Sequence, residues 1–181
     1  MFDRQNFVFG IRTLKLVPAA GQQYRVRWYT FQFVVNDPPF FLKGMNWMPL
    51  DSLLRLPADR YRWALELARD AGIQLLRVWS GGGIPESDDF YQLCDQYGLM
   101  VWQDSFIANM ETPNWPQDIL QAQVCLNLYR TRNHPSLAVH CGGNEFNPYA
   151  FGNAASMFVI ERNIADLDPV RPFFRTTADR G

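Results

Sequence analysis

The chain has 181 residues, of which 48% are hydrophobic and 15% aromatic, and its formal net charge is -1. This composition is typical of a folded protein with one substantial core and excludes a disordered chain. Its basic residues form no stripe that could follow a phosphate backbone, so we expect no nucleic-acid partner. Without an apolar run of roughly 18 residues or a signal-peptide pattern, we expect a soluble, cytoplasmic protein with no membrane partner.

The first 36 residues differ from the rest of the chain. Strand-like runs cover residues 7–17 and 24–35, with a turn over residues 18–22 between them. The run Asn36-Asp37-Pro38-Pro39 then predicts a tight turn, because Asn and Asp favour turn conformations and proline fixes φ. We expect residues 1–36 to be the end of an all-β module and residues 37–181 to form a second unit.

Strands and helices alternate from residue 40 onward. Gly72 and Gly98 are placed to end two of the helices, Ser87 to cap one, and Asp168-Pro169 to break the last. Helices are predicted over residues 57–71, 87–97 and 117–132, and around 157–167. Strands are predicted at residues 40–44, 73–79, 99–104, 136–141 and 172–176.

This alternation predicts an α/β fold built from repeated βα units. The strand centres, 26 to 36 residues apart, are Phe41, Leu75, Val101, Leu137 and Phe173. A doubly wound sheet would carry GxGxxG after its first strand, which residues 43–47 do not supply. A barrel places functional residues at many strand ends. Because a complete one takes about 250 residues, we expect the first half of a (β/α)8 TIM barrel, preceded by the β strands of residues 1–36.

The stretch from Asn133 to Glu145, NHPSLAVHCGGNE, holds the clearest functional candidate. Its apolar run lies between a proline and two glycines, which is typical of a buried parallel strand. At the mouth of such a strand Glu145 can act as a general acid, and Asn144 can bind a hydroxyl beside the reacting centre. A glutamate that caps a loop or faces solvent explains the same motif, so these residues alone leave both interpretations open.

No metal site is predicted. Cys94, Cys125 and Cys141 lie singly within apolar patterns and are interpreted as small core residues, which fits a reducing compartment. His134 and His140 lack the spacing of a zinc site. The three glycines at 81–83 are not followed by the Lys-Ser/Thr of a phosphate loop. We therefore expect no cofactor.

Five motifs occur in a recognisable order. They are FLKGMNWMPLD at 41–51, LRVWSGGGI at 76–84, DFYQLCD at 89–95, VWQD at 101–104 and NHPS to NE at 133–145. Together they resemble glycoside hydrolase family 2, in its β-mannosidase branch. The sequence departs from the commonest family form at Ser80, where glycine is usual, and at Gly143, where asparagine is frequent.

The resemblance implies an exo-acting, retaining hydrolase of terminal β-linked sugars. Glu145 matches the general acid/base after the fourth strand, and the nucleophilic glutamate after the seventh strand lies outside this chain. Asn144 matches the residue that binds the sugar 2-hydroxyl, and Trp79 an aromatic residue of the sugar pocket. Further substrate-binding residues are expected at Asn46, Trp47, Arg77, Trp102 and Asp104. The resemblance also makes residues 1–36 the end of an immunoglobulin-like sandwich and its linker.

Two alternatives stay open. One is another glycosidase of the same family, such as a glucosaminidase, galactosidase or glucuronidase. The other is a noncatalytic carbohydrate-binding or interaction module that keeps the aromatic rim but has lost the nucleophile. The expected partners are a carbohydrate and the remainder of the same polypeptide, which would complete the barrel. A second copy of the chain is a further candidate, because an open half-barrel exposes a strand edge.

Overall fold

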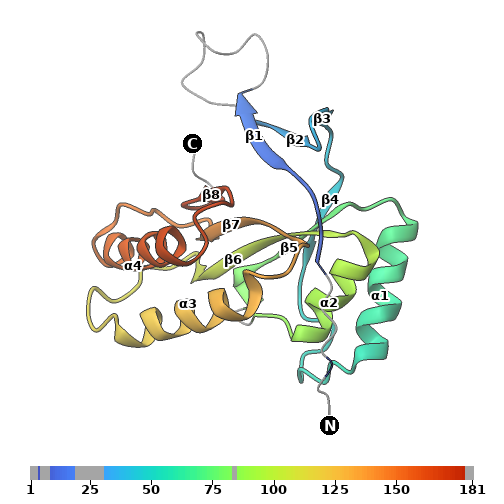
Figure 1. The fold of residues 1–181 in the computed structure, drawn as a ribbon. Coiled ribbons are helices and arrows are strands. Elements are labelled where there is room, and N and C mark those ends of the chain that lie inside the picture. The colour runs from blue at the N-terminus through green and yellow to red at the C-terminus, as the bar shows by residue number, and fades with distance from the viewer. Residues whose placement is uncertain (1–3, 5–8, 19–30, 83–84, 178–181) are drawn as a thin grey trace.

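The computed structural model describes residues 4, 9–18, 31–82 and 85–177, and Figure 1 shows their arrangement. A parallel sheet with the strand order β4-β5-β6-β7-β8 alternates with helices α1 to α4. This order confirms the prediction of half a (β/α)8 barrel. Parts of the predicted runs at 7–17 and 24–35, the turn after Pro18, and Gly83 lie outside the described residues.

The elements have the following bounds. The parallel strands are β4 (Gly44–Trp47), β5 (Leu75–Val78), β6 (Met100–Ala108), β7 (Leu137–Asn144) and β8 (Phe173–Phe174). The helices are α1 (Ala58–Asp70), α2 (Asp88–Tyr97), α3 (Asp118–Thr131) and α4 (Phe151–Leu167), with a 3-10 turn η1 (Ser80–Gly82). An antiparallel sheet contains β1 (Leu14–Pro18), β2 (Phe31–Val35) and β3 (Pro39–Phe40).

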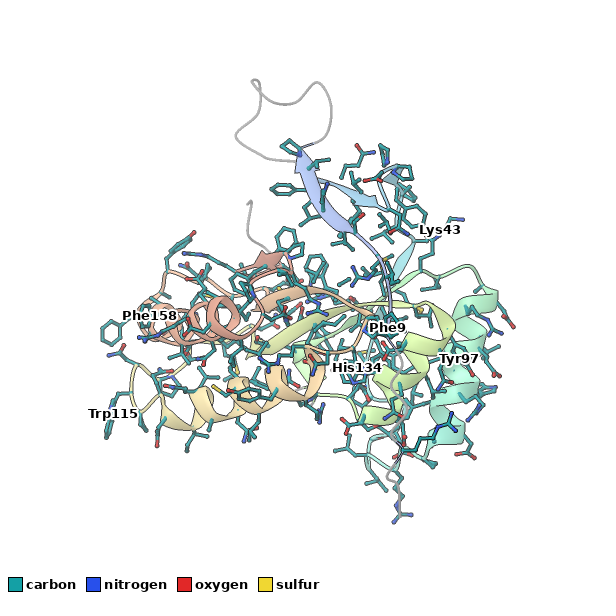
Figure 2. All side chains as sticks on the ribbon, in the orientation of Figure 1. Phe9, Lys43, Tyr97, Trp115, His134 and Phe158 are labelled. Carbon is teal, nitrogen blue, oxygen red and sulfur yellow. The ribbon has the colours of Figure 1, made fainter. Side chains whose placement is uncertain are left out.

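Helices cover one face of the parallel sheet and bury its apolar side chains. Helix α1 presents Tyr61, Leu65 and Ala68, whose spacing of three and four residues forms a single stripe. This stripe packs with α2 against β5 and β6, and α3 and α4 pack together over the next part of the sheet. The outer surfaces of the helical layer keep apolar side chains too: Figure 2 shows Trp115 and Phe158 pointing outward, and they are 81% and 63% exposed. No helix among the described residues is long and apolar enough to cross a membrane.

The first barrel strand lies later than predicted. We expected residues 40–44 with Phe41 at the centre, but Phe41 is 86% exposed and the parallel strand covers Gly44–Trp47. The reason is that Phe40 still pairs with Phe33 in the antiparallel sheet, so the chain must cross from one sheet to the other before β4 begins. The predicted cap at Ser87 is also incorrect in detail, because its side chain makes no capping hydrogen bond to α2.

Two strands are longer than predicted. Strand β6 runs beyond Asp104 to Ala108, and β7 runs through Gly142 and Gly143 to Asn144. Both glycines therefore lie within β7, and both positions require glycine because other parts of the protein come too close for a side chain. A Cβ on Gly142 would lie 2.2 Å from the Arg175 carbonyl oxygen, and one on Gly143 would lie 2.1 Å from that of Ile107.

The antiparallel sheet packs against the amino-terminal part of the sheet face that the helices leave open (Figure 1). Leu75, Met100 and Val139 of the parallel strands are buried there against side chains from β1 to β3. The expected boundary at 36/37 falls in the turn between β2 and β3, so residues on both sides of it share one sheet. The assignment of residues 1–36 to an immunoglobulin-like sandwich stays a prediction.

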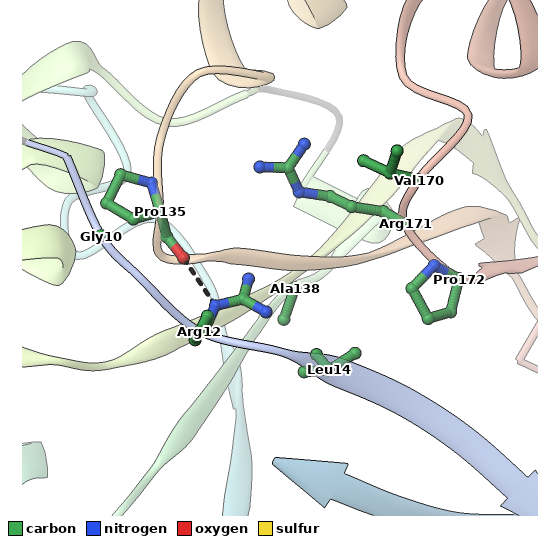
Figure 3. A pocket seen from close by; sticks show the side chains of 8 residues that line it. All are labelled: Gly10, Arg12, Leu14, Pro135, Ala138, Val170, Arg171 and Pro172. Atoms are coloured by element: carbon green, nitrogen blue, oxygen red, sulfur yellow. Dashed lines mark hydrogen bonds between the residues drawn. The ribbon is translucent and has the colours of Figure 1, made fainter. Parts of the chain in front are cut away.

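The segment from Gly10 to Arg12, which precedes β1 and is called the strap below, is hydrogen-bonded to the chain at the start of β7. Arg12 Nε donates to the Pro135 carbonyl at 2.9 Å and Arg12 Nη2 to the Leu137 carbonyl at 2.6 Å. Figure 3 shows this contact beside a pocket of about 230 Å³. Gly10 permits the approach, because a Cβ there would lie 2.4 Å from Pro135 Cβ. Burial and the charge of Arg171 lower the pKa of Arg12.

A buried charge cluster lies where α4 ends. Asp168 Oδ2 lies 2.8 Å from His140 Nε2 and accepts a hydrogen bond from Arg171 Nη1 at 2.6 Å. Burial acts to raise the pKa of Asp168, but the hydrogen bond with His140 and the charge of Arg171 outweigh it, so this pKa lies below the ordinary value of 3.8. The lowered pKa means that the ionised form of Asp168 stabilises the fold.

We expect Asp168→Asn to lower the free energy of unfolding of this chain by about 2 kcal/mol at pH 7, since hydrogen bonds to charged groups contribute roughly 1.5–3 kcal/mol. The Asp168 contribution is present above the unfolded-state pKa and is lost as the pH falls through the lower folded-state pKa. The difference between the two proteins should therefore shrink below about pH 3.8. Urea unfolding between pH 7 and pH 2 measures it. The control is Asp166→Asn, whose carboxylate is 66% exposed and 3.8 Å from Arg162; an equal loss there would contradict the prediction.

Candidate active site

Polar side chains gather at the carboxyl ends of the parallel strands and on the interior face of the sheet. The register pairs Asn46 with Arg77, and Arg77 with Trp102, so these three side chains share one face. They line an open pocket of about 390 Å³ together with Thr177, which follows β8. Functional sites of (β/α)8 barrels lie at this end of the strands.

Asp104 is the buried centre of this group. Its side chain is fully buried and forms an ion pair with Arg77, with 2.7 Å between Oδ2 and Nη2. It also accepts hydrogen bonds from Trp102 Nε1 at 3.0 Å and from the Ser80 backbone N–H at 3.2 Å. The protein therefore uses both carboxylate oxygens, which makes Asp104 a support for its neighbours and leaves it no free oxygen with which to attack a sugar.

Arg77 extends this support to Asn144. A second hydrogen bond from Arg77 Nη2 reaches Asn144 Oδ1 at 2.7 Å, and Arg77 Nη1 reaches Asn46 Oδ1 at 3.3 Å. Because a guanidinium only donates, the oxygen of the Asn144 side chain must face Arg77. The Asn144 NH₂ group then donates to Asn109 Oδ1 at 2.8 Å. The amide of Asn144 is thus fixed in one orientation, with 4% of the residue exposed.

Glu145 follows β7 directly and is exposed. Its φ of 44° lies in the left-handed region, which L residues with long side chains rarely adopt. Thr177 Oγ1 accepts a hydrogen bond from the Glu145 backbone N–H at 3.1 Å, and Asn109 Nδ2 donates to Glu145 Oε2 at 3.4 Å. These contacts come from residues that follow β6 and β8, and they leave the carboxyl group exposed, where a ligand can reach it.

The three tryptophans predicted for the sugar site lie in different surroundings. Trp102 stacks on Phe174 with 4.9 Å between ring centroids and lines the pocket. Trp79 is partly buried beside Gly81, where a Cβ would lie 1.9 Å from the indole. Trp47 lies in the core and not at the rim, because it points to the helix side of β4 and is 4% exposed.

The Trp47 indole instead belongs to a buried cluster around Glu86. Trp47 Nε1 donates to Glu86 Oε1 at 3.0 Å, and the Tyr61 hydroxyl donates to Glu86 Oε2. Burial raises the pKa of Glu86, although both hydrogen bonds oppose that shift. This cluster holds α1 and the segment before α2 against β4. The structure gives Trp47 a packing role, and its placement does not support the expected contact with a sugar.

Among the described residues, this edge supports neither a thiol nucleophile nor a metal site. Burial and the charge of Asp104 raise the pKa of the Cys141 thiol to about 12, so the thiol stays protonated and is a poor nucleophile. Over the described part of the chain, no three His, Cys, Asp or Glu side chains lie close enough to hold a metal ion. The arrangement is suited to proton transfer at Glu145 beside a hydrogen-bonding amide at Asn144.

Three contributors were not among the predicted site residues: Asn109, Thr177 and, as a contact of Asp104, Ser80. Ser80 Oγ donates to the Ile107 carbonyl at 2.8 Å and lies 3.3 Å from Asp104 Oδ2, so the departure from glycine adds a link between η1 and β6. Asn109 lies between the strand predicted at 99–104 and the helix predicted at 117–132, where no element was predicted. The signal available in the sequence was its position five residues after Asp104, but its proximity to Asn144 depends on how β6 and β7 pair.

Fold and site together define half of a (β/α)8 barrel with polar side chains at the carboxyl ends of its strands. Residues 26–178 match the family described as glycosyl hydrolases family 2, TIM barrel domain. The chain belongs to this family. The fold class and the resemblance seen in the sequence are thereby confirmed.

Curated relatives of this chain include β-mannosidases. The chain is 39% identical over 140 residues to the β-mannosidase B of Emericella nidulans, a match that covers 76% of this chain and 16% of that protein. It is 34% identical over 172 residues to the β-mannosidase of Rattus norvegicus, covering 84% and 19%. The chain therefore spans less than a fifth of the length of these curated relatives.

Two solved structures have a similar fold. The β-D-mannosidase of Dictyoglomus thermophilum superposes with a TM-score of 0.80 at 37% identity, covering 93% of this chain and 22% of that one. The exo-chitosanase of Amycolatopsis orientalis superposes with a TM-score of 0.73 over 95% of this chain and 20% of its own. At 20% identity the second likeness shows the fold alone.

Proposed function

We propose that this chain supplies the acid/base half of a retaining exo-β-glycosidase of the β-mannosidase type. The observation that carries the proposal is Glu145 at the mouth of β7, next to an Asn144 amide that Arg77 and Asn109 hold in one orientation. Glu145 would protonate the glycosidic oxygen and later deprotonate water, while Asn144 would bind the sugar hydroxyl next to the anomeric carbon. Trp79 and Trp102 are proposed as apolar walls, since indoles suit the C–H faces of sugars.

In this proposal, the nucleophile of the retaining reaction lies outside these 181 residues. Retaining hydrolysis needs two carboxyl groups about 5–5.5 Å apart. Asp104 is the carboxylate at the neighbouring strand end, and it is fully buried by Arg77, Trp102 and Ser80. We therefore propose that the remainder of the polypeptide completes the barrel along the open edges of β4 and β8. A second copy of the chain could cover the same edges but would bring no residue placed as a nucleophile.

The test uses dinitrophenyl β-mannoside as substrate. The chain alone should show no turnover, because it holds an acid without a nucleophile. Hydrolysis should appear when a polypeptide carrying the remainder of the barrel is added, and its steady-state rate should fall strongly when Glu145 is replaced by Gln, because the second step needs a base. Hydrolysis by the chain alone that depends on Glu145 would contradict the placement of the nucleophile. A mixture that forms the complex but cleaves none of the aryl β-mannoside, β-glucosaminide, β-galactoside and β-glucuronide would contradict the glycosidase proposal itself and favour a binding module.

A further inference from the structure

Asn109 is one of the residues at this edge to which the resemblance and the sequence motifs assign no role. We propose that Asn109 is a positioning residue that fixes the Asn144 amide and supports the ionised form of Glu145. The inference rests on the proposed function for its catalytic meaning. Its structural part, a donor contact from Asn109 to Glu145, can be tested without turnover.

A bulge in β6 brings Asn109 to the site. Asp104 pairs with Cys141, and the next pair is Ile107 with Gly143, so β6 has one more residue than β7 in this interval. A bulge of this kind re-aims the strand and is common beside active sites. Pairing then resumes up to Ala108 and Asn144, and the Asn109 backbone N–H donates to the Asn144 carbonyl at 2.9 Å.

The direction of the hydrogen bonds follows from Arg77. Because its guanidinium has no acceptor, Asn144 must turn its Oδ1 to Arg77 and its Nδ2 to Asn109. Asn109 must then offer its Oδ1 to Asn144, which leaves its own Nδ2 facing Glu145 Oε2 at 3.4 Å. The side chains form one chain of hydrogen bonds, each donated toward the next residue, that runs from the partly buried Arg77 guanidinium to the exposed Glu145 carboxyl group. Its last link can only be an N–H that donates to Glu145.

This last link has a defined chemical effect. A hydrogen bond donated to a carboxylate favours the ionised form over the protonated form. Glu145 needs that form in the second half of a retaining reaction, when it takes a proton from water. Since Asn109 binds Oε2, the other oxygen is left to exchange the proton with the glycosidic oxygen. Asn109 would therefore act on the base step without touching the substrate.

The backbone at Asn109 suits asparagine. Its φ is 53°, in the left-handed region that asparagine tolerates better than most residues with a side chain. The turn between β2 and β3 contains a second asparagine with the same φ, Asn36, whose Oδ1 accepts from the Thr13 backbone N–H at 3.0 Å. Asn36 is a matched control, because the same substitution there meets the same backbone demand far from the proposed site in the sequence.

The first experiment follows the Glu145 carboxyl ¹³C chemical shift through pH in the 181-residue chain. Asn109→Asp replaces the donor by a second carboxylate, and a like charge disfavours ionisation, so the midpoint should rise by about one pH unit or more. Asn109→Gly keeps the left-handed backbone and removes the amide, so a smaller rise is expected. Asn36→Asp should leave the midpoint unchanged. An unchanged midpoint in both Asn109 variants would overturn the inference, whatever the activity of the assembled protein.

The second experiment measures hydrolysis of dinitrophenyl β-mannoside by the chain joined to the remainder of the barrel. Asn109→Asp should move the acid limb of the kcat profile upward by about one pH unit and so lower kcat about tenfold on that limb, because the second step needs ionised Glu145, while Asn36→Asp should do neither. A profile that is the same for wild type and Asn109→Asp would overturn the catalytic part of the inference. Absence of turnover in the wild type would instead count against the proposed function, and the chemical-shift result would still decide the contact between Asn109 and Glu145.

Discussion

Replacing Glu145 by alanine in the assembled barrel should lower kcat/KM for an unactivated β-mannoside by about 10²- to 10⁴-fold, the range that general acid–base catalysis supplies. The loss should be much smaller for the first step with a dinitrophenyl leaving group, because this group departs without a proton. The second step still needs a base to activate water. Sodium azide needs none, and it should restore turnover and release a glycosyl azide of retained configuration.

The control for this variant is Glu66→Ala on α1. Glu66 accepts a hydrogen bond from the Tyr97 hydroxyl at 2.8 Å on the helical layer, away from the ends of the parallel strands. Its removal should leave kcat/KM nearly unchanged and should produce no response to azide. A Glu145→Ala protein that hydrolyses unactivated substrates normally, or that gives no azide adduct with the activated one, would contradict the acid/base assignment.

Replacing Asp104 by alanine should lower the free energy of unfolding of the chain by about 3–5 kcal/mol, because it leaves a partly buried guanidinium without its counter-charge. The Arg77 side chain is 16% exposed and that of Asp104 is fully buried. By contrast, Asp70→Ala should cost at most about 1 kcal/mol, since this carboxylate is 67% exposed beside Arg69. Urea unfolding at pH 7 compares the two.

A double variant separates the ion pair from the buried charge. Asp104→Leu combined with Arg77→Met replaces both partners by apolar side chains and should recover much of the stability lost in Asp104→Ala. The double variant should nevertheless lose the fixed orientation of Asn144, and with it activity in the assembled barrel. Stability losses of equal size in Asp104→Ala and Asp70→Ala would show that the pair contributes little to the fold.

The helices on the outside of the half-barrel were predictable because their signals are local. Gly72 and Gly98 adopt φ of 77° and 69°, the left-handed values that glycine accepts at a helix end, and α1 and α2 end within two residues of them. The apolar stripe of α1 likewise depends only on a repeat of three and four residues. Such signals hold regardless of what the rest of the chain does.

Strand ends were less predictable because they depend on the partner strand. A shift of the first barrel strand to Gly44–Trp47 decides which of its side chains face the helices, and it sends Trp47 into the core. The bulge after Asp104 arises from the pairing of β6 with β7, and no local pattern predicts it. The candidate acid/base and its neighbour Asn144 were found from motif resemblance, whereas Asn109 became visible only once the two strands were aligned.

The strap formed by Gly10 and Arg12 has a consequence for the time course of synthesis. Its hydrogen bonds join residues 123 and 125 positions apart, so Arg12 leaves the ribosome long before the carbonyls of Pro135 and Leu137 exist. At about 5–20 residues per second, the wait lasts roughly 6–25 s. During that interval the face of the antiparallel sheet that later covers Leu75, Met100 and Val139 has no complete partner. The antiparallel sheet is therefore fixed by the strap only after 123 residues beyond Arg12 have been made, and until then its apolar face is accessible to a chaperone.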